Sequence, residues 1–331
     1  TRAAAIVKAV DNPAALRQAH PEAVTIHRHY FEPAYPAGRS PENIVDETLS
    51  TLAGFMPTYV QLFNETRQRM PAFADHVELM TACATILHSR GYKVLGSAFS
   101  TGEPQDTEWL YWQSHAFSGV DAIAVNEYWA LLDVPIPLRF TIWNALRHRQ
   151  VHALLKVHPP FIITEAGRDM VRDGDINVNR GYVGEKGWRN DGISTEDYIA
   201  ECQAYEAELQ KDDYVIGWVL FNGGGWANWP AYEWEEIAER LAKLFYYDGQ
   251  PLLVKPSPPD VTTPSHNNGG VTMPIDKVLA QQALDISGGQ MEAIKTEAEI
   301  LITSPRMTKQ RRQGLAKNMQ ANAADTQAHL V

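Results

Sequence analysis

The first 250 residues alternate short runs rich in β-branched and aromatic residues with longer helical stretches. This alternation is typical of parallel strands joined by crossover helices. The predicted strands cover residues 4–10, 23–30, 58–64, 93–98, 121–126, 160–165 and 214–221. The predicted helices include Pro13 to Ala19, Phe73 to Arg90, Leu138 to Leu155 and Thr195 to Gln210, the last with Ser194 as its N-terminal cap. The pattern therefore predicts an α/β fold built on parallel strands.

A TIM-type (β/α)8 barrel is the closed form of this pattern, and it needs eight strands where seven are visible. The chain opens on Thr1 rather than Met, and its first predicted strand starts within a few residues. We therefore expect residues 1–250 to form a barrel that lacks its first strand, so that the visible strands are the second to the eighth. A signal peptide would have preceded Thr1 as well, and its presence would favour a secreted or extracellular location.

The composition changes after residue 250. Residues 251–274 hold six prolines and an Asn-Asn-Gly-Gly run, which predicts a linker. Residues 275–331 have helical periodicity and end in a basic, Gln-rich stretch, which predicts a helical tail or the start of a further module. Acidic residues nearly balance the basic ones there, so a solvated helical surface is favoured over a nucleic-acid patch.

Charge and hydropathy narrow the classes of partner. The formal net charge of -11 at pH 7 disfavours nucleic acid, because phosphate binding needs clustered Lys and Arg. No apolar run approaches the roughly 20 residues that span a bilayer, which disfavours a membrane partner. Cys83 and Cys202 do not decide a redox compartment. A neutral or cationic ligand remains the expectation, and the oligomeric state stays open.

Two predicted strands end in glutamate, namely the run from Tyr59 to Glu65 and the run from Phe161 to Glu165. The carboxyl ends of barrel strands face the active site, and glycoside hydrolysis needs a pair of carboxylates. The alternative for Glu65 is a first-turn helical glutamate after a capping Asn64. The alternative for Glu165 is a surface salt bridge, which is less favoured because Ile162-Ile163-Thr164 is typical of a buried strand.

Two further strand ends carry polar or small residues. Asn126-Glu127-Tyr128-Trp129 follows one of them, and Tyr128 could hydrogen-bond a nucleophilic carboxylate and hold it ionised. Residues 95–104 end another strand in a loop of small residues that leaves room for a ligand. His27, His29 and His115 lack metal-site spacing, so we interpret them as structural or peripheral.

The order of these motifs resembles that of the clan A glycoside hydrolases, and most closely their family thirty-nine-like, cellulase-type (β/α)8 barrels. The matching motifs are Asn64-Glu65, Ser100-Thr101-Gly102-Glu103-Pro104, Asn126-Glu127-Tyr128 and Ile163-Thr164-Glu165, within residues 4 to about 245. The resemblance implies a retaining enzyme that cleaves a poly- or oligosaccharide without a metal or organic cofactor. It implies Glu65 as acid/base on the fourth strand and Glu165 as nucleophile on the seventh.

The same resemblance implies supporting roles for Asn64, Tyr128, Glu127 and, more loosely, Arg28. The clan usually places Trp late on the eighth strand, whereas this chain has Trp218 early and Phe221 where the indole is expected. Aromatic faces stack on sugar rings, and each candidate has local packing as its alternative. The substrate-binding candidates are Trp129, Trp188, Trp218, Phe221, Trp226 and Trp229, with Trp234 in the same loop region.

Three other interpretations arise from the sequence, and the first of them fails. Asn126-Glu127 as the acid/base motif fails on spacing, because 165 - 127 = 38 residues hold one strand-helix step, whereas 165 - 65 = 100 fit the three steps that are needed. A non-catalytic carbohydrate-binding barrel would use the same aromatic residues, and a barrel enzyme for another substrate is not excluded by fold. A retaining pair requires carboxyl groups roughly 5–5.5 Å apart, and an inverting pair requires about 6.5–9.5 Å.

Overall fold

The computed structural model describes residues 6–17, 19, 23–31, 38–65, 72–129, 140, 145–155, 157–169, 187–190, 192–223, 230–247 and 250–251. These residues belong to one compact unit. The predicted linker, apart from Pro251, and the predicted tail lie outside the described residues.

Parallel strands form at all seven predicted positions of the described chain. They are β1 (Ile6–Val10), β2 (Val24–Arg28), β3 (Tyr59–Gln61), β4 (Val94–Leu95), β5 (Ile123–Trp129), β6 (Phe161–Arg168) and β7 (Val215–Leu220). Strands β5 and β6 run three residues past their predicted ends because they pair with each other up to Trp129 and Arg168. A short antiparallel pair, β8 (Tyr246–Tyr247) and β9 (Gln250–Pro251), follows them.

The strands follow one another in sequence order, as crossover connections require. One sheet has the order β1-β2-β3-β4 and the other the order β5-β6-β7. Single parallel bridges from Leu95 to Ala122 and from Phe99 to Val125 connect β4 to β5. At the other side β7 lies against β1, where a Cβ added to Gly217 would come within 2.6 Å of Ile6 Cδ1. The strand ladders of the described chain do not include a β1–β7 pair, so closure into a barrel stays a prediction.

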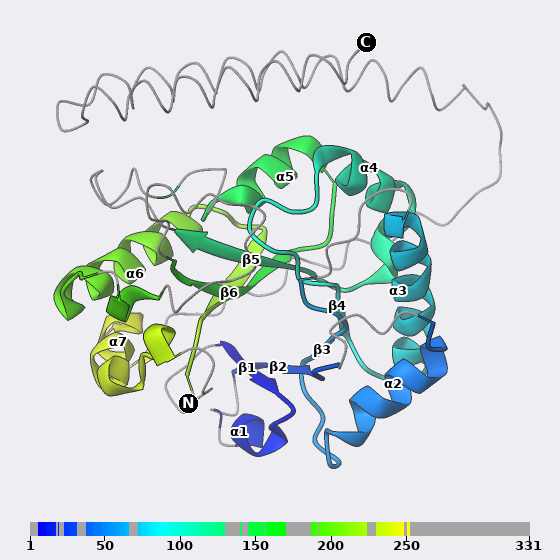
Figure 1. Cartoon of the computed structure of the whole chain (residues 1–331), viewed down its shortest axis with the longest axis horizontal. Coiled ribbons are helices and arrows are strands. Elements are labelled where there is room, and N and C mark those ends of the chain that lie inside the picture. The colour runs from blue at the N-terminus through cyan, green and yellow to red at the C-terminus, as the bar shows by residue number, and fades with distance from the viewer. Residues whose placement is uncertain are drawn as a thin grey trace, which may run out of the picture. The chain divides into compact units, whose positions relative to one another are not determined.

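The helices of the described unit lie outside the strands (Figure 1). The α-helices are α1 (Pro13–Arg17), α2 (Pro41–Ser50), α3 (Ala72–Ser89), α4 (Asp106–Ser114), α5 (Arg147–Leu155), α6 (Thr195–Leu209) and α7 (Ala238–Phe245). The 3-10 turns are η1 (Ala116–Gly119), η2 (Trp188–Asn190), η3 (Pro230–Tyr232) and η4 (Glu235–Ile237). Helix α6 begins where predicted, because the Ser194 side chain accepts a hydrogen bond from the backbone N–H of Asp197.

All seven strands contribute to one apolar cluster. Its buried members are Ile6, Ile26, Tyr59, Leu95, Ala98, Ala122, Ala124, Ile162 and Ile216. Side chains on a strand alternate between its two faces, so residues two positions further along point to the same side. On β1, β2, β3, β5 and β6 these residues are Lys8, Arg28, Gln61, Asn126 and Thr164. A polar layer therefore lies next to the apolar cluster, toward the carboxyl ends of the strands.

Candidate active site

Glu165 reaches the polar layer through an irregularity in β6. Val125 of β5 pairs with Ile163, but the next residue, Asn126, pairs with Glu165, so Thr164 is an extra residue on β6. Such a bulge changes which way the following side chain points. The Thr164 hydroxyl donates to Asn126 Oδ1 at 2.8 Å, and Glu165 contacts side chains from β1, β2 and β5. Both Thr164 and Glu165 thereby face the same side of the sheet.

Two cations and a phenol surround the Glu165 carboxylate. Lys8 Nζ lies 2.9 Å from Oε1, and Arg28 Nη1 lies 3.7 Å from the same oxygen. Tyr128 donates its hydroxyl to Oε2 at 3.1 Å. Burial alone would raise the pKa of Glu165, but the charges of Lys8 and Arg28 and the hydrogen bonds from Lys8 and Tyr128 hold it below its ordinary value. Glu165 is therefore held as an anion, as a nucleophile must be.

Glu65 follows β3 in a left-handed backbone conformation, with φ of 50°. This conformation is uncommon for a residue with a side chain, and here the backbone N–H of Glu65 donates to the Ala98 carbonyl at 2.7 Å. Asn126 Nδ2 donates to Glu65 Oε1 at 3.2 Å. Burial and the negative charge of Glu165 raise the pKa of Glu65, although the Asn126 hydrogen bond acts in the opposite direction. Glu65 therefore keeps a proton more readily than an ordinary glutamate.

The two glutamates thus differ in the way that acid and nucleophile must differ. The charge of Glu165 is one of the two causes that raise the pKa of Glu65. Two carboxyl groups whose surroundings move their pKa values apart are the pattern of a general acid beside an ionised partner. The arrangement can donate a proton and provide a carboxylate within one polar layer.

Arg28 and Asn64, two other predicted supporting residues, differ in their contacts with the glutamates. Arg28 belongs to the Glu165 environment, as described above. The amide of Asn64 accepts a hydrogen bond from Gln61 Nε2 at 3.3 Å, and among the described residues the amide hydrogen-bonded to Glu65 is that of Asn126. We therefore assign the amide that orients Glu65 to β5 rather than to the residue that precedes Glu65.

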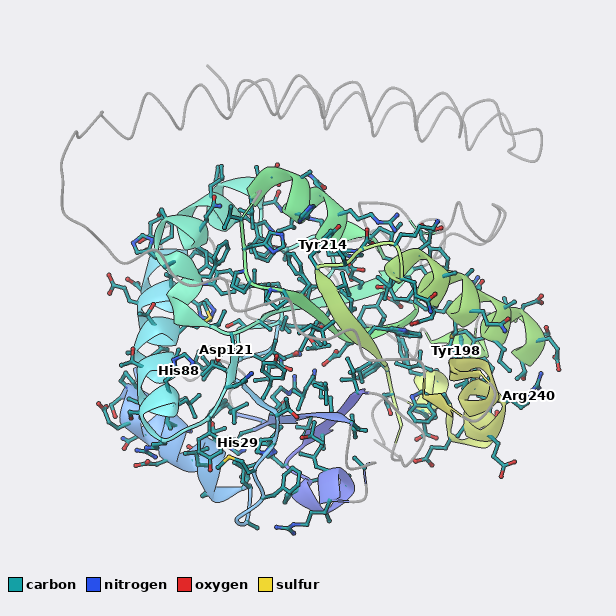
Figure 2. The ribbon with its side chains drawn as sticks, turned by 180° about the vertical axis from the view of Figure 1, so that it is seen from behind. His29, His88, Asp121, Tyr198, Tyr214 and Arg240 are labelled. Carbon is teal, nitrogen blue, oxygen red and sulfur yellow. The ribbon has the colours of Figure 1, made fainter. Side chains whose placement is uncertain are left out.

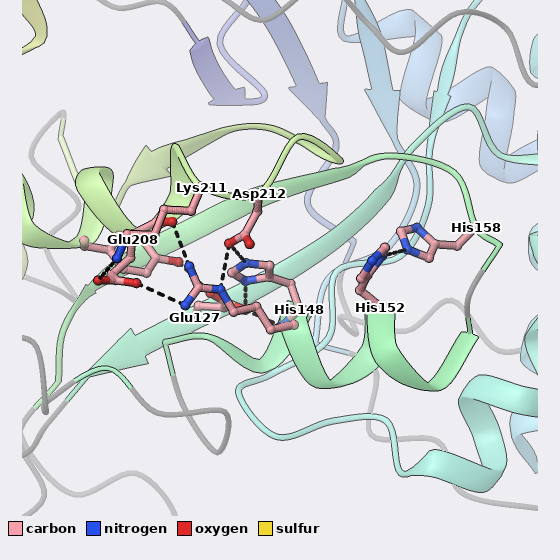
Figure 3. Close-up of polar contacts among 9 residues, drawn as sticks. Glu127, His148, His152, His158, Glu208, Lys211 and Asp212 are labelled. Carbon is pink, nitrogen blue, oxygen red and sulfur yellow. Dashed lines mark hydrogen bonds and ion pairs between the residues drawn. The ribbon is translucent and has the colours of Figure 1, made fainter. Parts of the chain in front are cut away.

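Glu127 points away from this layer, into a buried cluster between β5 and helices α5 and α6 (Figure 3). It accepts hydrogen bonds from His148 Nδ1 at 2.9 Å and from the Tyr205 hydroxyl at 2.6 Å. His148 Nε2 lies 3.0 Å from Asp212 Oδ2. Strand alternation explains the difference, because Glu127 directly follows the inward-facing Asn126. The expected supporting role of Glu127 at the site is therefore not supported.

The stability that this cluster contributes depends on pH through the protonation of His148. Burial opposes a charge on the imidazole, but the Glu127 and Asp212 carboxylates outweigh burial and raise the pKa of His148 to about 9. An unfolded His titrates near 6.5, so the stabilisation is complete below about pH 6.5 and is lost as pH rises through 9. Its size is on the order of 3 kcal/mol.

We therefore expect His148→Asn to lower the free energy of unfolding by about 3–5 kcal/mol at pH 6, because it leaves Glu127 without its charged partner. Urea unfolding of both proteins from pH 6 to pH 10 measures this difference, which should shrink with rising pH. The quantity to compare is the difference in unfolding free energy between the two proteins. Lys8, with a pKa lowered to about 8 by burial, makes the stability of both proteins rise with pH above 8, and this effect cancels in the difference.

His88→Asn is the matched control for this experiment. His88 on α3 pairs with Asp121 at 2.8 Å, and both side chains are more than a third exposed (Figure 2). Loss of such a surface pair costs at most about 1 kcal/mol. Equal losses for His148→Asn and His88→Asn, or a His148→Asn loss that does not change with pH, would contradict this account.

Three predicted substrate-binding indoles contact helix α6. Trp129 is fully buried and donates to Glu201 of α6 at 2.8 Å. Trp188 stacks on Tyr198 of α6 at 4.6 Å, and Trp218 donates to Glu206 of the same helix. A register shift in β7 places Ile216 and Val219 against the apolar cluster, so Trp218 between them faces α6. The alternative interpretation, local packing, therefore fits all three better.

Phe221 is brought to the site. Its ring lies 6.0 Å from that of Tyr128 and 5.4 Å from that of Tyr232. Because Tyr128 donates a hydrogen bond to Glu165, these three aromatic rings lie next to Glu165. Trp234 donates to the Leu220 carbonyl at 3.2 Å, and Trp226 and Trp229 lie outside the described residues.

Lys8 and Asn126 are the residues that sequence reasoning missed as partners of the glutamates. Lys8 stands within the apolar run Ile6 to Val10, two residues after Ile6. A lysine on the inward face of a strand is costly to bury unless it is paired, and that signal could have identified Lys8.

The histidines without metal spacing have other partners. His27 binds the Thr51 hydroxyl at 2.7 Å, His29 bridges Asp11 and Glu47, and His115 bonds within its own helix end. Within the described part of the chain there is no group of three or more His, Cys, Asp or Glu residues that could hold a metal ion. None of the described helices is long and apolar enough to cross a membrane.

Comparison with known proteins does not identify a family for this chain. No family model and no curated relative matches the chain. Solved structures with some likeness include a glucosidase from Croceicoccus marinus, with 13% identity, a TM-score of 0.41 and coverage of 62% of this chain and 43% of the other. A family 51 α-L-arabinofuranosidase from Bifidobacterium longum has 11% identity, a TM-score of 0.41 and coverages of 64% and 49%.

A third similar structure is an oligosaccharide-binding protein from Cryptococcus neoformans, with 13% identity, a TM-score of 0.37 and coverage of 76% of this chain and 91% of the other. The chain thus spans less than half of the glucosidase and about half of the arabinofuranosidase. At these TM-scores the likenesses carry no argument, and the residues around Glu65 and Glu165 must carry the functional one.

Proposed function

We propose that this chain is a glycoside hydrolase that cleaves O-glycosidic bonds of a poly- or oligosaccharide by a retaining mechanism. Glu165 is the nucleophile and Glu65 the general acid and base. The observation that carries this proposal is the contrast between the surroundings of the two carboxyl groups. Lys8, Arg28 and Tyr128 surround Glu165 and lower its pKa, whereas Glu65 is held by Asn126, and burial and the charge of Glu165 raise its pKa. The proposal requires no metal or organic cofactor.

The seven strands belong, in this proposal, to a (β/α)8-type barrel. Its support is that every strand contributes to one apolar cluster and that β7 lies against β1. Glu65 follows β3 and Glu165 lies in the carboxyl half of β6, on the side where such barrels hold their active sites.

In the first step Glu165 attacks the anomeric carbon while Glu65 protonates the departing glycosidic oxygen. In the second step Glu65 takes a proton from water, and the water oxygen replaces the Glu165 ester at the anomeric carbon. Asn126 donates to Glu65 Oε1, so the acidic proton resides on Oε2. Tyr128 and the two cations keep Glu165 ionised between turnovers.

The first test is a panel of 4-nitrophenyl glycosides and soluble polysaccharides, with products followed by proton NMR. Retaining chemistry releases the sugar first in the anomeric configuration of the substrate. Initial release of the opposite anomer would contradict the retaining mechanism. Binding of a polysaccharide without any hydrolysis would favour a non-catalytic carbohydrate-binding barrel.

The pKa directions also predict the pH dependence of kcat/KM. Activity should rise as Glu165 loses its proton, below the ordinary glutamate pKa of about 4.3, and fall as Glu65 loses its proton above that value. The plot of kcat/KM against pH is therefore expected to be bell-shaped. Circular dichroism at each pH confirms that the protein stays folded. A rate that keeps rising above neutral pH while the protein stays folded would contradict the assignment of Glu65 as the acid.

A further inference from the structure

Lys8 of β1 is in direct contact with Glu165 of β6. It extends from β1, its side chain is 5% exposed, and its Nζ lies 2.9 Å from Glu165 Oε1 and 3.4 Å from the Thr164 carbonyl oxygen. Lys8 therefore holds both the nucleophilic residue and the bulged residue before it. The contact joins β1 to β6, which are not neighbours in either sheet.

The two carboxylate oxygens of Glu165 have unequal surroundings. Both cations, Lys8 at 2.9 Å and Arg28 at 3.7 Å, lie on Oε1, whereas Oε2 receives the neutral hydroxyl of Tyr128 at 3.1 Å. An oxygen held by charge-assisted contacts gives up electron density to them and is the poorer nucleophile. Oε2 is the oxygen better able to attack.

We propose that Lys8 is the positioning residue of the nucleophile: it fixes Oε1, leaves Oε2 to form the bond to the sugar, and helps Glu165 depart in the second step. This inference rests on the proposed retaining mechanism. Lys8 touches Glu165 and acts on the reaction through it.

The bond changes define what Lys8 does in each step. In the first, a lone pair of Oε2 forms the C1–Oε2 bond, and the C1–O bond to the leaving group breaks with its electron pair and takes the proton of Glu65. In the second, water forms the new C1–O bond and gives a proton to Glu65, and the C1–Oε2 pair returns to Glu165. The carboxylate loses its charge in the first step and regains it in the second.

A cation beside Oε1 therefore affects the two steps in opposite directions. It stabilises the anion, which makes Glu165 a weaker nucleophile and a better leaving group. Loss of the charge should slow the second step most, so that the covalent ester accumulates. A residue that only stabilises the fold would not separate the two steps.

The experiment compares Lys8→Met, which removes the charge, with Lys8→Arg, which keeps it. The probe is whichever 4-nitrophenyl glycoside of glucose, galactose, xylose or glucuronic acid the wild-type protein hydrolyses. We expect Lys8→Met to lower kcat about tenfold to hundredfold, with a lower KM, a smaller change in kcat/KM and a burst of nitrophenol. Lys8→Arg should restore most of kcat. Parallel losses of kcat and kcat/KM without a burst would overturn the inference.

A second measurement needs no substrate and so separates this inference from the proposed function. Carbon-13 NMR of the Glu165 carboxyl group follows its pKa in the wild type and in Lys8→Met. Within the described ranges, the charged and titratable groups that face Glu165 are Lys8, Arg28, Tyr128 and Glu65. We expect the pKa of Glu165 to rise by about 1 to 3 in Lys8→Met and to stay low in Lys8→Arg.

An unchanged Glu165 pKa in Lys8→Met would overturn the role of Lys8 even if the wild type hydrolyses glycosides. A raised pKa together with no hydrolysis of any probe by the wild type would instead count against the proposed function, and would leave the Lys8–Glu165 coupling established. The two failures are therefore distinguishable.

Discussion

Glu165→Gln is expected to lower kcat on the order of 10⁴- to 10⁶-fold, because an amide cannot form the covalent intermediate. Lys8, Arg28 and Tyr128 contact the carboxylate, which in the proposed mechanism attacks through one oxygen. Glutamine keeps the size of the side chain, so the loss should come from the chemistry. Steady-state rates on the 4-nitrophenyl glycoside that the wild type hydrolyses measure it.

Glu78→Gln is the matched control, since Glu78 is exposed on α3. We expect this control to keep the wild-type rate, with thermal unfolding curves to verify that both variants are folded. A Glu165→Gln protein that is folded and retains more than about a tenth of the wild-type kcat would contradict the role of Glu165.

Glu65→Gln is expected to lower kcat/KM about 10²- to 10⁴-fold for substrates whose leaving group needs protonation. Burial and the charge of Glu165 raise the pKa of Glu65, so Glu65 keeps its acidic proton to higher pH than an ordinary glutamate, whereas glutamine has no acidic proton to give. For a 2,4-dinitrophenyl glycoside, whose leaving group departs without protonation, the first step should slow much less. The acid role is measured in Glu65→Gln by comparing two losses of kcat/KM, one for the 2,4-dinitrophenyl glycoside and one for a glycoside whose leaving group needs protonation.

The same comparison carries its own control. Wild-type protein should hydrolyse both the 2,4-dinitrophenyl glycoside and the glycoside whose leaving group needs protonation. Glu65→Gln should lose much more kcat/KM with the second glycoside than with the first. Equal losses for both leaving groups would show that Glu65 affects binding or folding rather than proton transfer. The alkaline limb of the pH profile should also disappear for Glu65→Gln with the dinitrophenyl substrate, because Glu65 no longer titrates.

Sequence alone located the seven parallel strands, because each is an apolar run between turn-forming residues, but it did not predict the short pair β8–β9. Their ends were less predictable. β5 and β6 extend to Trp129 and Arg168 because they pair with each other, and pairing between distant segments is not written in either run. The bulge at Thr164 has the same origin, since it exists only in the register between β5 and β6.

The candidate site followed from sequence where a residue stands at or near the end of a predicted strand. Glu65, Glu165, Tyr128 and Arg28 lie in or beside the polar layer, and this could be expected because parallel strands end together. Lys8 was missed because it stands mid-strand, and its role depends on β1 approaching β6. Glu127 was placed at the site because its neighbours are there, although alternation turns it to the other face.

The tryptophans show the limit of reading side chains by type. Trp129, Trp188 and Trp218 have the chemistry to stack on sugars, but their indole surfaces are taken by helix α6 or residues beside it. Large aromatic residues bury much area wherever they pack, so their type does not tell a binding surface from a core. Phe221 differs because it packs against Tyr128, a partner of Glu165.

The most direct test of the central claim is to trap the covalent intermediate and locate it. The probes are 2,4-dinitrophenyl 2-deoxy-2-fluoro glycosides of the sugars that the wild type accepts, in which the fluorine slows both steps and the activated leaving group keeps the first step the faster. Mass spectrometry of the digested protein should find one glycosyl unit on the peptide that contains Glu165, and none in Glu165→Gln. Turnover of the matching substrate with an unlabelled Glu165, or with the label on another carboxylate, would contradict the account.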